Sequence, residues 1–497
     1  MDNPGPPTRL PVRMESLLSR LSAKPALSIL LLGLVLLLSG TWILPLMDRD
    51  EPRFAEASRE MLQRHDAVVP WLNGAYRFDK PPLIYWCQMG CYRLLGESAF
   101  AARLPSVFFT VGTALALLCW GRRTSSTETG FAAALIWLTC LQVLVHGRLA
   151  VADMAMVFFV TTANWTAWEL SRREGARRMA WAAMFASSLS LGFLAKGPVG
   201  WLPLGGLILG RALRPAEFQA SWPLLGACVA TALAGVALWG VPALLATHGE
   251  FYRVGIGRHV IQRSFDVMEG HGGSGWLGYT LTLPLYFLTF FLSFFPWAFW
   301  VPARLRAWWP GRQQDPLGWY LLVQAGLVFG VFCLVRTKLP HYTLPAFPCL
   351  ALWLARQTAQ FPGWRRTLAC GTCGMAVLAL AVTLGGFGWG SSRTIAANLW
   401  QGVRPHARPE MPIGVAGFNE PSVVWEFRQT VTNYVEFLRP EKAAEFWARP
   451  GPRILIVPTK SAAKLSAAAP ASAIQVRATG YDTVHFDHYD LTALIRQ

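Results

Sequence analysis

Eleven apolar segments recur along this chain, and they restrict its fold more than any other feature of the sequence. A helix needs about 20 apolar residues, within a range of about 17–25, to cross the hydrocarbon core of a bilayer. We therefore expect a polytopic α-helical membrane protein with about 11 transmembrane helices. The Lys196-Gly197-Pro198 break predicts a tight hairpin between the fifth and sixth segments. The segments lie at about residues 26–47, 104–121, 130–146, 151–170, 179–195, 198–211, 222–246, 277–302, 317–335, 341–357 and 367–390.

The composition of the chain agrees with a membrane protein. Only 15% of the 497 residues are charged and 53% are hydrophobic, whereas a soluble protein has about 25% charged residues. The 23 Trp and 29 Phe suit membrane interfaces. The net charge of +17 could indicate a nucleic-acid partner. Its basic residues are spread over short loops, however, so we attribute the charge to membrane topology and expect no nucleic-acid partner.

The positions of these basic residues predict an orientation. Clusters such as Arg122–Arg123 and Arg365–Arg366 follow the even-numbered segments. With eleven spans, all such clusters fall on one side, which the positive-inside rule assigns to the cytoplasm. The N-terminus is then cytoplasmic and the C-terminus lies outside. The first apolar run is too long for a cleaved signal, so we expect an uncleaved first span.

The chain divides into two expected domains. Residues 1–390 form a transmembrane catalytic domain, which includes a first outer loop at 48–103. Residues 391–497 change character and predict a small soluble α/β domain outside the membrane. Within it, Arg453–Lys460 is a short apolar run typical of a buried strand, and Ser422–Trp425 begins a strand or a helix.

The first outer loop is dense in charge and begins with three acids, Asp48, Asp50 and Glu51. One interpretation is structural: an acid caps a helix, with Pro52 at its first position and acids in its first turn. The other is chemical, because a carboxylate at the end of a span is partly desolvated and suits a general base.

Asp153 lies at the outer start of the fourth segment. An acid that enters a span is costly. It either pairs with Arg148 at the interface or acts as a second carboxylate facing an outer cavity. Lys80 precedes Pro81, which favours an extended backbone there. A lysine held in this way suits a phosphate, although it could also reach lipid headgroups.

Two further outer groups of polar residues are candidates. Arg336, Lys338 and Arg263 could clamp a lipid phosphate, and Lys338 lies close to His341 and Tyr342. His259 and His271 lie in the loop before the eighth segment, and with nearby carboxylates they could ligate a metal. The chain lacks a Gly-rich phosphate loop of the P-loop type, so no nucleotide cofactor is expected.

Several motifs resemble the bacterial aminoarabinose lipid A transferase family, which is related to protein O-mannosyltransferases and has the GT-C glycosyltransferase fold. The motifs are D-E-P-R-F-A-E at Asp50–Glu56, W-L-N-G at Trp71–Gly74, F-D-K-P-P-L-I-Y-W at Phe78–Trp86, L-A-K-G-P at Leu194–Pro198, T-K-L-P-H-Y at Thr337–Tyr342 and F-N-E-P-S at Phe418–Ser422. The resemblance implies an inner-membrane enzyme of the bacterial cell. It implies transfer of a sugar, with inversion, from an undecaprenyl-phosphate donor to lipid A, a glycan or a protein at the periplasmic face.

The resemblance also implies roles for residues. The catalytic acids would be Asp50, with Glu51 beside it, and Asp153. The lipid phosphate would be bound by Lys80, with Tyr342 and Arg263 as helpers. A divalent metal (zinc, magnesium or manganese) would be held by Asp79, which replaces the usual Glu of the family, and by His259 or His271.

Two other classes of function compete with this one. A transporter or flippase for a lipid-linked sugar would have charged residues near the bilayer midplane, often in repeated halves. Here the charged residues gather at one face. A binding protein for an envelope polymer would not need its acids, yet this chain keeps Asp50, Glu51, Asp153 and Lys80.

Overall fold

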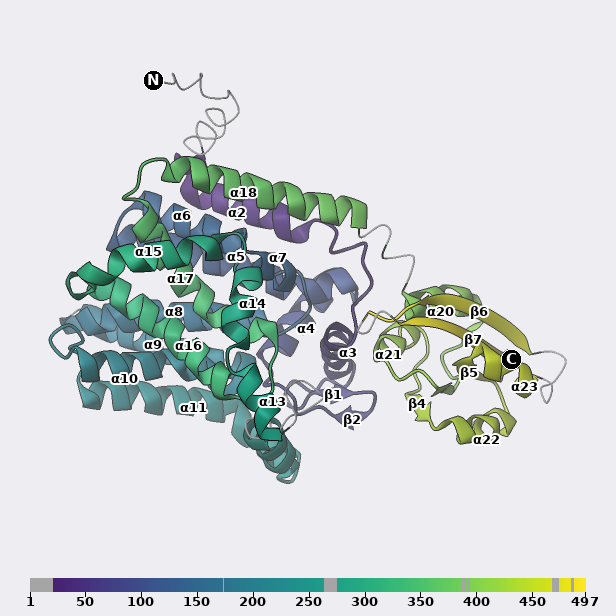
Figure 1. Cartoon of the computed structure of the whole chain (residues 1–497). Coiled ribbons are helices and arrows are strands. Elements are labelled where there is room, and N and C mark those ends of the chain that lie inside the picture. Colours follow the sequence, from purple (N-terminus) through teal and green to yellow (C-terminus); the bar gives the residue numbers. More distant parts are fainter. Residues whose placement is uncertain are drawn as a thin grey trace, which may run out of the picture. The chain divides into compact units, whose positions relative to one another are not determined.

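The structure, a computed structural model, describes residues 21–172, 174–262, 275–386, 390, 394–466, 473–483 and 487–497. The chain packs as two compact units, each built from separate stretches of sequence (Figure 1). The first comprises the described parts of residues 1–39, 78–84 and 105–380, and the second those of residues 40–77, 85–104 and 381–497. The second unit therefore combines most of the first outer loop with the C-terminal region. The domain boundary expected at residue 390 stays a prediction.

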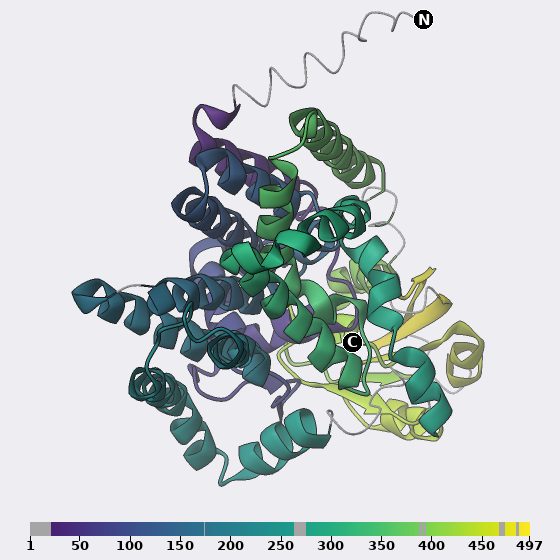
Figure 2. The ribbon, with the colours of Figure 1, turned by 60° about the vertical axis from the view of Figure 1, so that its left-hand side comes forward.

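Helices make up the first unit, and Figure 2 shows them as a bundle. They are α2 (Pro25–Leu38), α5 (Ala99–Thr124), α6 (Thr127–Leu138), α7 (Leu141–His146), α8 (Asp153–Arg172), α9 (Gly175–Lys196), η1 (Gly197–Trp201), α10 (Leu202–Leu213), α11 (Trp222–Ala246), η2 (Phe251–Gln262), α13 (Gly275–Thr282), α14 (Leu285–Ser293), η3 (Trp297–Trp300), α15 (Val301–Trp308), η4 (Trp309–Gln314), α16 (Pro316–Leu334), η5 (Pro340–Ala346), α17 (Phe347–Thr358) and α18 (Trp364–Ala381), after which η6 (Val382–Gly386) begins the last part of the second unit.

Each of the eleven predicted apolar segments overlaps at least one helix. Within the described residues, five helical segments are long and apolar enough to cross a membrane, or six if the bent pair at 278–293 and 297–314 is one span. One of the five, Gly175–Leu213, includes the turn between α9 and α10. The chain is thus a multi-helix membrane protein, and the expected number of 11 spans stays a prediction.

The predicted hairpin between the fifth and sixth segments is confirmed. Gly197 has a positive φ of 72°, which ends α9 without the strain that a side chain would cause. The backbone then returns so closely that a Cβ on Gly200 would lie 2.3 Å from the carbonyl carbon of Gly192. Trp201 fastens the turn, because its Nε1 donates to the carbonyl of Leu189 at 3.0 Å.

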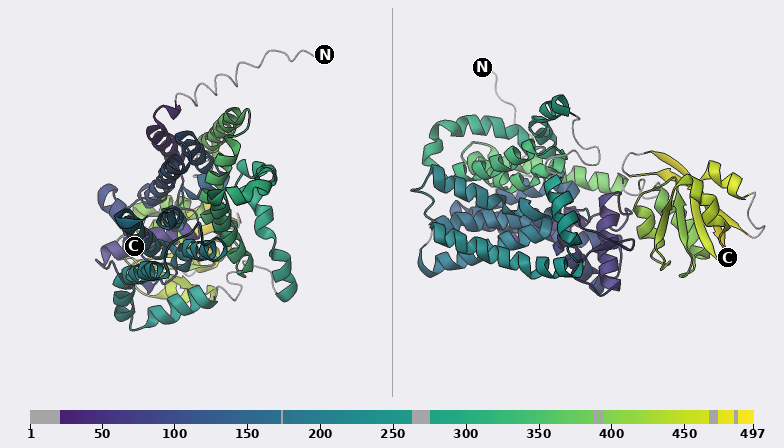
Figure 3. Two further views of the ribbon diagram at one scale, coloured as in Figure 1. Left: turned by 90° about the vertical axis from the view of Figure 1, so that its left-hand side faces the viewer. Right: turned by 90° about the horizontal axis from the view of Figure 1, so that it is seen from below.

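The C-terminal part of the second unit is built on a mixed five-stranded sheet with strand order β4-β3-β5-β7-β6. Strand β3 pairs in parallel with β4 and β5, and β7 pairs antiparallel with β5 and β6. The right-hand view of Figure 3 shows this sheet among its helices. The strands are β3 (Ile413–Ala416), β4 (Val435–Leu438), β5 (Arg453–Pro458), β6 (Ile474–Tyr481) and β7 (His488–Arg496), and the helical segments are α20 (Ile395–Val403), η7 (Arg404–His406), α21 (Ser422–Phe427), η8 (Pro440–Lys442), α22 (Ala443–Ala448) and α23 (Thr459–Ser466).

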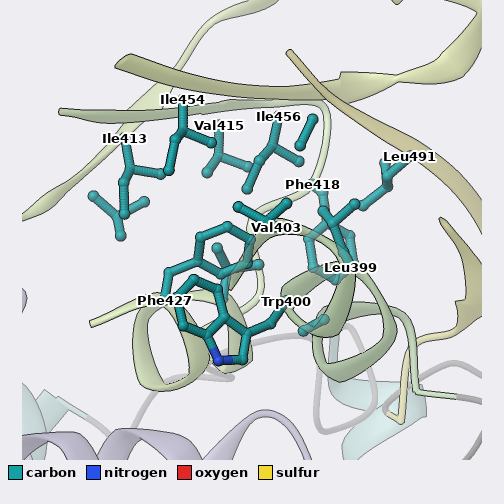
Figure 4. Close-up of a cluster of buried hydrophobic side chains, with 14 of the residues drawn as sticks. Leu399, Trp400, Val403, Ile413, Val415, Phe418, Phe427, Ile454, Ile456 and Leu491 are labelled. Atoms are coloured by element: carbon teal, nitrogen blue, oxygen red, sulfur yellow. The ribbon is translucent and has the colours of Figure 1, made fainter. Parts of the chain in front are cut away.

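This sheet is covered on both faces, because side chains alternate along its strands. Ile454 and Ile456 of β5 face a cluster that includes Trp400 of α20 and Phe427 of α21 (Figure 4). Leu455, between them, packs in a second cluster with α22 and α23. The predicted strand at residues 453–460 is therefore β5, and the segment that begins at Ser422 is a helix, α21.

The first outer loop supplies the remaining elements: α3 (Asp50–Gln63), the short antiparallel strands β1 (Trp71–Leu72) and β2 (Ala75–Tyr76), and α4 (Leu83–Leu95). Within the second unit, α3 packs against α21. Helix α3 begins at Asp50 itself, and the preceding Arg49 makes no side-chain cap. The prediction of an acid at the N-cap is therefore wrong, because the N-cap residue is Arg49. The prediction of acids in the first turn is confirmed, because Asp50 and Glu51 lie there.

Candidate functional site

Asp153 is the centre of a polar cluster in the first unit. It is the first residue of α8, and its side chain is 8% exposed. The Nζ of Lys196, at the end of α9, donates to Oδ1 of Asp153 at 2.6 Å. The Nε2 of His341 in η5 lies 3.9 Å from the same oxygen. The ring of His146, the last residue of α7, lies 4.9 Å from the ring of His341. Four helix ends thus bring one acid and three bases together.

The partner of Asp153 differs from the residue that we considered in the sequence. Arg148 donates through Nη2 to the carbonyl of Leu36 at 2.5 Å, and the ion pair of Asp153 is formed by Lys196. The hairpin explains this choice, because the turn after α9 holds Lys196 beside the start of α8.

A cavity of about 480 Å³ adjoins this cluster. Its volume falls in the range of about 300–1,000 Å³ that is common for ligand sites. The walls are mostly apolar, and the polar lining residues are Asp79, Lys80, Lys196, Thr337 and Tyr342. The apolar lining residues are Phe78, Pro81, Met156, Phe193, Gly197, Pro198, Val199, Leu202, Val236, Trp239, Gly240, Leu244, Phe251, Gly255, Val331, Phe332 and Val335.

Lys80 lines this cavity. It lies in the segment that connects β2 to Pro81 and Pro82. Its Nζ donates to the carbonyl of Asp79 at 3.1 Å. The neighbouring Phe78 holds the segment in place, because its ring packs 5.7 Å from that of Phe251, which in turn packs 5.1 Å from Trp239. Lys80 also lies close enough to influence the charge of His341. The structure therefore brings Lys80 and Lys196 to the lining of one cavity, with Asp153 hydrogen-bonded to Lys196 behind it.

Tyr342 also lines the cavity, and its ring packs 5.0 Å from Phe332 and 5.1 Å from His341. The Nζ of Lys196 lies 5.6 Å from the centre of the Tyr342 ring, which is a cation–π contact. Of the predicted phosphate ligands, Lys80 and Tyr342 thus line one cavity.

Lys338 lies elsewhere. It is buried, and its Nζ donates to the carbonyls of Phe332, at 2.9 Å, and of Cys333. Those carbonyls belong to the last turn of α16, where a cation also interacts favourably with the helix dipole. In this structure Lys338 therefore caps α16 and does not line the cavity.

The two acids at the start of α3, in the second unit, differ from each other. Glu51 is 2% exposed and receives two hydrogen bonds from Arg103, at 2.8 and 2.7 Å. Arg103 also donates to the carbonyls of Thr41, Leu44 and Pro45. Asp50, one residue earlier, is exposed. The buried acid fixes the start of the helix, and the exposed acid is accessible to another molecule.

Asp48, the third acid of the loop, joins it to the C-terminal region of the same unit. Its Oδ1 accepts from the backbone N–H of Ser422 at 2.8 Å, and its own N–H donates to Thr483 at 2.6 Å. Burial raises the pKa of Asp48 to about 7, against the lowering effect of Ser422 and with a smaller raising effect from Glu420 and Asp482. The carboxyl group of Asp48 therefore titrates near neutral pH.

The predicted metal ligands are only partly visible. Asp79 lines the cavity, and the side chain of His259, on η2, is not among those described. Arg263 and His271 lie outside the described residues. The structure shows no group of three or more His, Cys, Asp or Glu residues suited to a metal within the part of the chain that it describes.

Sequence reasoning missed Lys196 and His146 as partners of Asp153. A signal existed for the lysine, because it is a lone charge between two apolar segments. The turn that contains Lys196 and the turn that leads to Asp153 were also both predicted to lie on the outer face. His146 had no comparable signal, since one histidine at a helix end is common in proteins.

Comparison with known proteins finds relatives of this chain. Residues 79–239 match a family described as dolichyl-phosphate-mannose-protein mannosyltransferase. Two proteins named undecaprenyl phosphate-alpha-4-amino-4-deoxy-L-arabinose arabinosyl transferase are similar over longer stretches. The one from Pectobacterium atrosepticum is 30% identical over 395 residues, which cover 74% of this chain and 66% of the relative. The one from Pectobacterium carotovorum is 32% identical over 356 residues, which cover 69% and 60%.

A solved structure extends the comparison to nearly the whole chain. The crystal structure of ArnT from Cupriavidus metallidurans bound to undecaprenyl phosphate superimposes with a TM-score of 0.77 at 16% identity, over 94% of this chain and 97% of that one. This chain is similar in sequence to the aminoarabinose transferases, and it has the GT-C fold. The resemblance and the fold expected from the motifs are thereby confirmed. The chain spans less than two thirds of the length of the two curated proteins that it matches.

Proposed function

We propose that this protein is a glycosyltransferase that takes its sugar from a polyprenyl-phosphate donor. One observation carries the proposal: a cavity of about 480 Å³ with mostly apolar walls has Lys80, Lys196 and Tyr342 among its few polar lining residues. Apolar walls suit an isoprenoid chain, because burial of apolar surface is favourable. Lysine ammonium groups suit its phosphate. The named relatives, which act on undecaprenyl-phosphate aminoarabinose, support the same class of donor.

In this proposal, Lys80 binds the lipid phosphate and stabilises the negative charge that develops as the sugar leaves. Tyr342 orients the phosphate through its hydroxyl. Arg263 is the third expected ligand. We leave Lys338 out of this set, because its ammonium group already holds the carbonyls at the end of α16.

Asp50 is the proposed general base, since it is the exposed acid of the first-loop pair. It would take the proton of the acceptor hydroxyl while the acceptor oxygen bonds to the anomeric carbon and the bond from that carbon to the phosphate oxygen breaks. The leaving group is polyprenyl phosphate, and attack from the opposite face inverts the anomeric configuration. Glu51 positions the helix through Arg103. Asp153 is paired with Lys196, so its proposed role is to orient that lysine.

The acceptor is lipid A or another glycan, lipid or protein of the envelope, and the sugar is aminoarabinose or another pentose or hexose. We further propose the bacterial inner membrane, with the N-terminus in the cytoplasm and the cavity and C-terminal domain at the periplasmic face. The divalent metal expected from Asp79 with His259 or His271 is a separate proposal. Activity after EDTA treatment and metal addition tests it.

The test is transfer of radiolabel from undecaprenyl-phosphate sugars to envelope fractions by purified wild type and by Lys80→Met. We expect label in one fraction with wild type and at least a tenfold higher KM for the donor in Lys80→Met, since tenfold corresponds to the loss of about 1.4 kcal/mol. Lys338→Met is the matched control. It should lower the Tm and leave the KM for the donor unchanged.

No transfer from any donor by folded wild type would contradict the proposal and favour a flippase, which a lipid-flipping assay detects. Equal donor KM values in wild type and Lys80→Met would remove Lys80 from the phosphate site.

A further inference from the structure

The first unit contains a second, larger and more polar cavity of about 700 Å³. It is lined by the end of α5, the start of α6, the segment from α15 to η4 and the end of α17, which includes Ser125, Ser126, Arg304, Gln314, Arg356 and Gln360. The proposed function does not use this cavity.

The two cavities lie toward opposite ends of α5. Ser106, near the start of α5, donates to the carbonyl of Val151, two residues before Asp153, at 3.2 Å. Ser125 follows Ser106 by 19 residues, which at about 1.5 Å per residue is roughly 28 Å along the helix. In the predicted topology, this end faces the cytoplasm.

Arg304 on α15 is the distinctive side chain in the second cavity. Its guanidinium lies over the ring of Phe361 at 3.5 Å and near that of Trp300 at 5.7 Å. Its Nε and Nη1 atoms are buried and have no hydrogen-bond acceptor in the part of the chain that the structure describes. Buried polar groups in native proteins normally have partners, and an unmet charged donor is especially costly.

The one acid that lines this cavity is already engaged. Asp315 accepts from Arg356 at 2.9 and 3.2 Å, from the indole of Trp308 at 2.9 Å and from the N–H of Gly318 at 3.0 Å. Burial acts to raise the pKa of Asp315, but these hydrogen bonds and the charge of Arg356 outweigh it and lower the pKa. Asp315 and Arg356 therefore neutralise each other, and the charge of Arg304 is left in excess.

The other polar groups around the cavity are neutral. Ser125 accepts from Nε of Arg356 at 3.1 Å, and Ser126 caps α6 by accepting from the N–H of Thr129 at 3.1 Å. Gln314 and Gln360 contribute amide groups. The nearby Glu128 pairs with Arg365 at 2.6 Å on the surface. The lining thus combines an unmatched guanidinium with hydroxyl and amide groups.

We propose that this second cavity binds a phosphate group, with Arg304 as its main ligand. The planar guanidinium presents paired N–H donors whose spacing matches phosphate oxygens. The group could be the headgroup of an anionic phospholipid or a soluble phosphate ester, since both present the same oxygens. Either would bring a negative charge to the Arg304 guanidinium, which lines the cavity and has no acidic partner among the described residues.

The experiment uses the purified full-length protein in detergent. Apparent Kd values are measured by native mass spectrometry and thermal shift for dioleoylphosphatidylglycerol, dioleoylphosphatidylcholine, glycerol 3-phosphate and inorganic phosphate. The variants are Arg304→Gln and Arg304→Lys, and the matched control is Arg306→Gln, which removes the same charge from an exposed position on α15. We expect Arg304→Gln to weaken binding at least tenfold, Arg304→Lys to weaken it less, and Arg306→Gln to leave it unchanged.

Loss of phosphatidylglycerol binding in Arg304→Gln would identify a lipid site, and loss of glycerol 3-phosphate or phosphate binding would identify a soluble ligand. Equal binding by wild type and Arg304→Gln, or no binding of any of the four, would overturn the proposal. If Arg304→Gln does not fold, Gly311→Leu serves instead. Gly311 lines the cavity and a Cβ there meets no atom within 4 Å, so the larger side chain should fit and weaken binding by occupying the space.

Discussion

Two groups of buried carboxylates, one in each unit, differ in their surroundings. In the first unit, Asp153 is one acid beside a mostly apolar cavity, with Lys196 as its ion-pair partner. In the second unit, α3 carries three buried acids in succession, and each is matched by arginine. Glu51 pairs with Arg103, Glu56 with Arg59 and Arg428, and Glu60 with Arg428.

This difference teaches that charge density along a sequence does not locate chemistry by itself. Several charges of the first outer loop build the second unit, where Arg59, Glu56 and Glu60 join α3 to the C-terminal region. A buried ion pair is costly to break, because the remaining charge is left without a partner. Of the acids at the start of α3, Asp50 is the exposed one.

The sharpest test of the comparison separates two neighbouring acids. Asp50→Asn should lower kcat by about 10²–10⁴, the usual contribution of a general base, and leave the Tm unchanged because Asp50 is exposed. Glu51→Gln should lower the Tm, since Glu51 is buried against Arg103. Transfer kinetics and thermal unfolding of both variants give the answer. A Tm loss in Asp50→Asn without a kinetic effect would make Asp50 structural.

The next effect concerns Arg103, which serves both Glu51 and three backbone carbonyls. Arg103→Met should destabilise the second unit by about 3–5 kcal/mol, because it leaves the buried Glu51 without its cation. The double variant Arg103→Met/Glu51→Gln should recover part of that loss. Denaturant unfolding followed by Trp fluorescence measures both, and an unchanged midpoint in Arg103→Met would show that the ion pair contributes nothing.

A smaller effect is expected in the first unit. Asp153→Asn and Lys196→Met remove the two halves of one ion pair at 2.6 Å. A double-mutant cycle on stability should give a coupling energy of about 0.5–3 kcal/mol, as is usual for residues in contact. Additive effects would mean that the two side chains act independently. The same variants also show, through the KM for the donor, whether Lys196 helps Lys80 at the phosphate.

The smallest effect is a pH dependence. The pKa of Asp48 is about 7 in the folded protein, above the ordinary 3.8. Between these values the folded state binds more protons than the unfolded state, so the contribution of Asp48 to stability is lost as the pH rises from about 4 to 7. Burial likewise raises the pKa of Glu56 and Glu426 to about 7. These acids contribute equally to the pH dependence of wild type and Asp48→Asn, so the difference between the two proteins isolates Asp48.

Asn keeps the oxygen that accepts from Ser422. Asp48→Asn should therefore be more stable than wild type at pH 8, by about 1 kcal/mol after allowance for solvent screening, and equal to it at pH 4. Tm values at both pH values measure the difference. A Tm gap that does not change with pH would show that Asp48 does not titrate in this range.

The sequence predicted the helical architecture well, because the length and apolarity of a segment are local properties. The hairpin at Lys196-Gly197-Pro198 was predictable for the same reason, since a glycine and a proline end the preceding helix. The motif around Asp50 and Lys80 gave the family. What the sequence could not supply were partners that meet only after folding. Arg428 and Glu56 are 372 positions apart, and nothing local to either predicts their ion pair.

Lys338 shows the same limit, because its partners in the structure differ from those expected from the sequence. From the sequence we expected Lys338 in a phosphate clamp with Arg336 and Arg263, and Tyr342 as a helper at the lipid phosphate. The lysine turns back onto the last carbonyls of α16, while the tyrosine lines the cavity. Two side chains four positions apart in an irregular segment need not point the same way, because only a regular helix fixes their direction.

The two-part construction of the second unit has a consequence for biosynthesis. Arg59 donates to the carbonyl of Trp425, 366 positions later in the chain. At about 5–20 residues per second, the ribosome needs roughly 20–70 s to make the intervening segment. During that interval the acids of α3 have been made but their C-terminal partners have not, and the nascent loop must stay soluble and undegraded until they arrive. The charges of α3 therefore remain without their C-terminal partners throughout that interval.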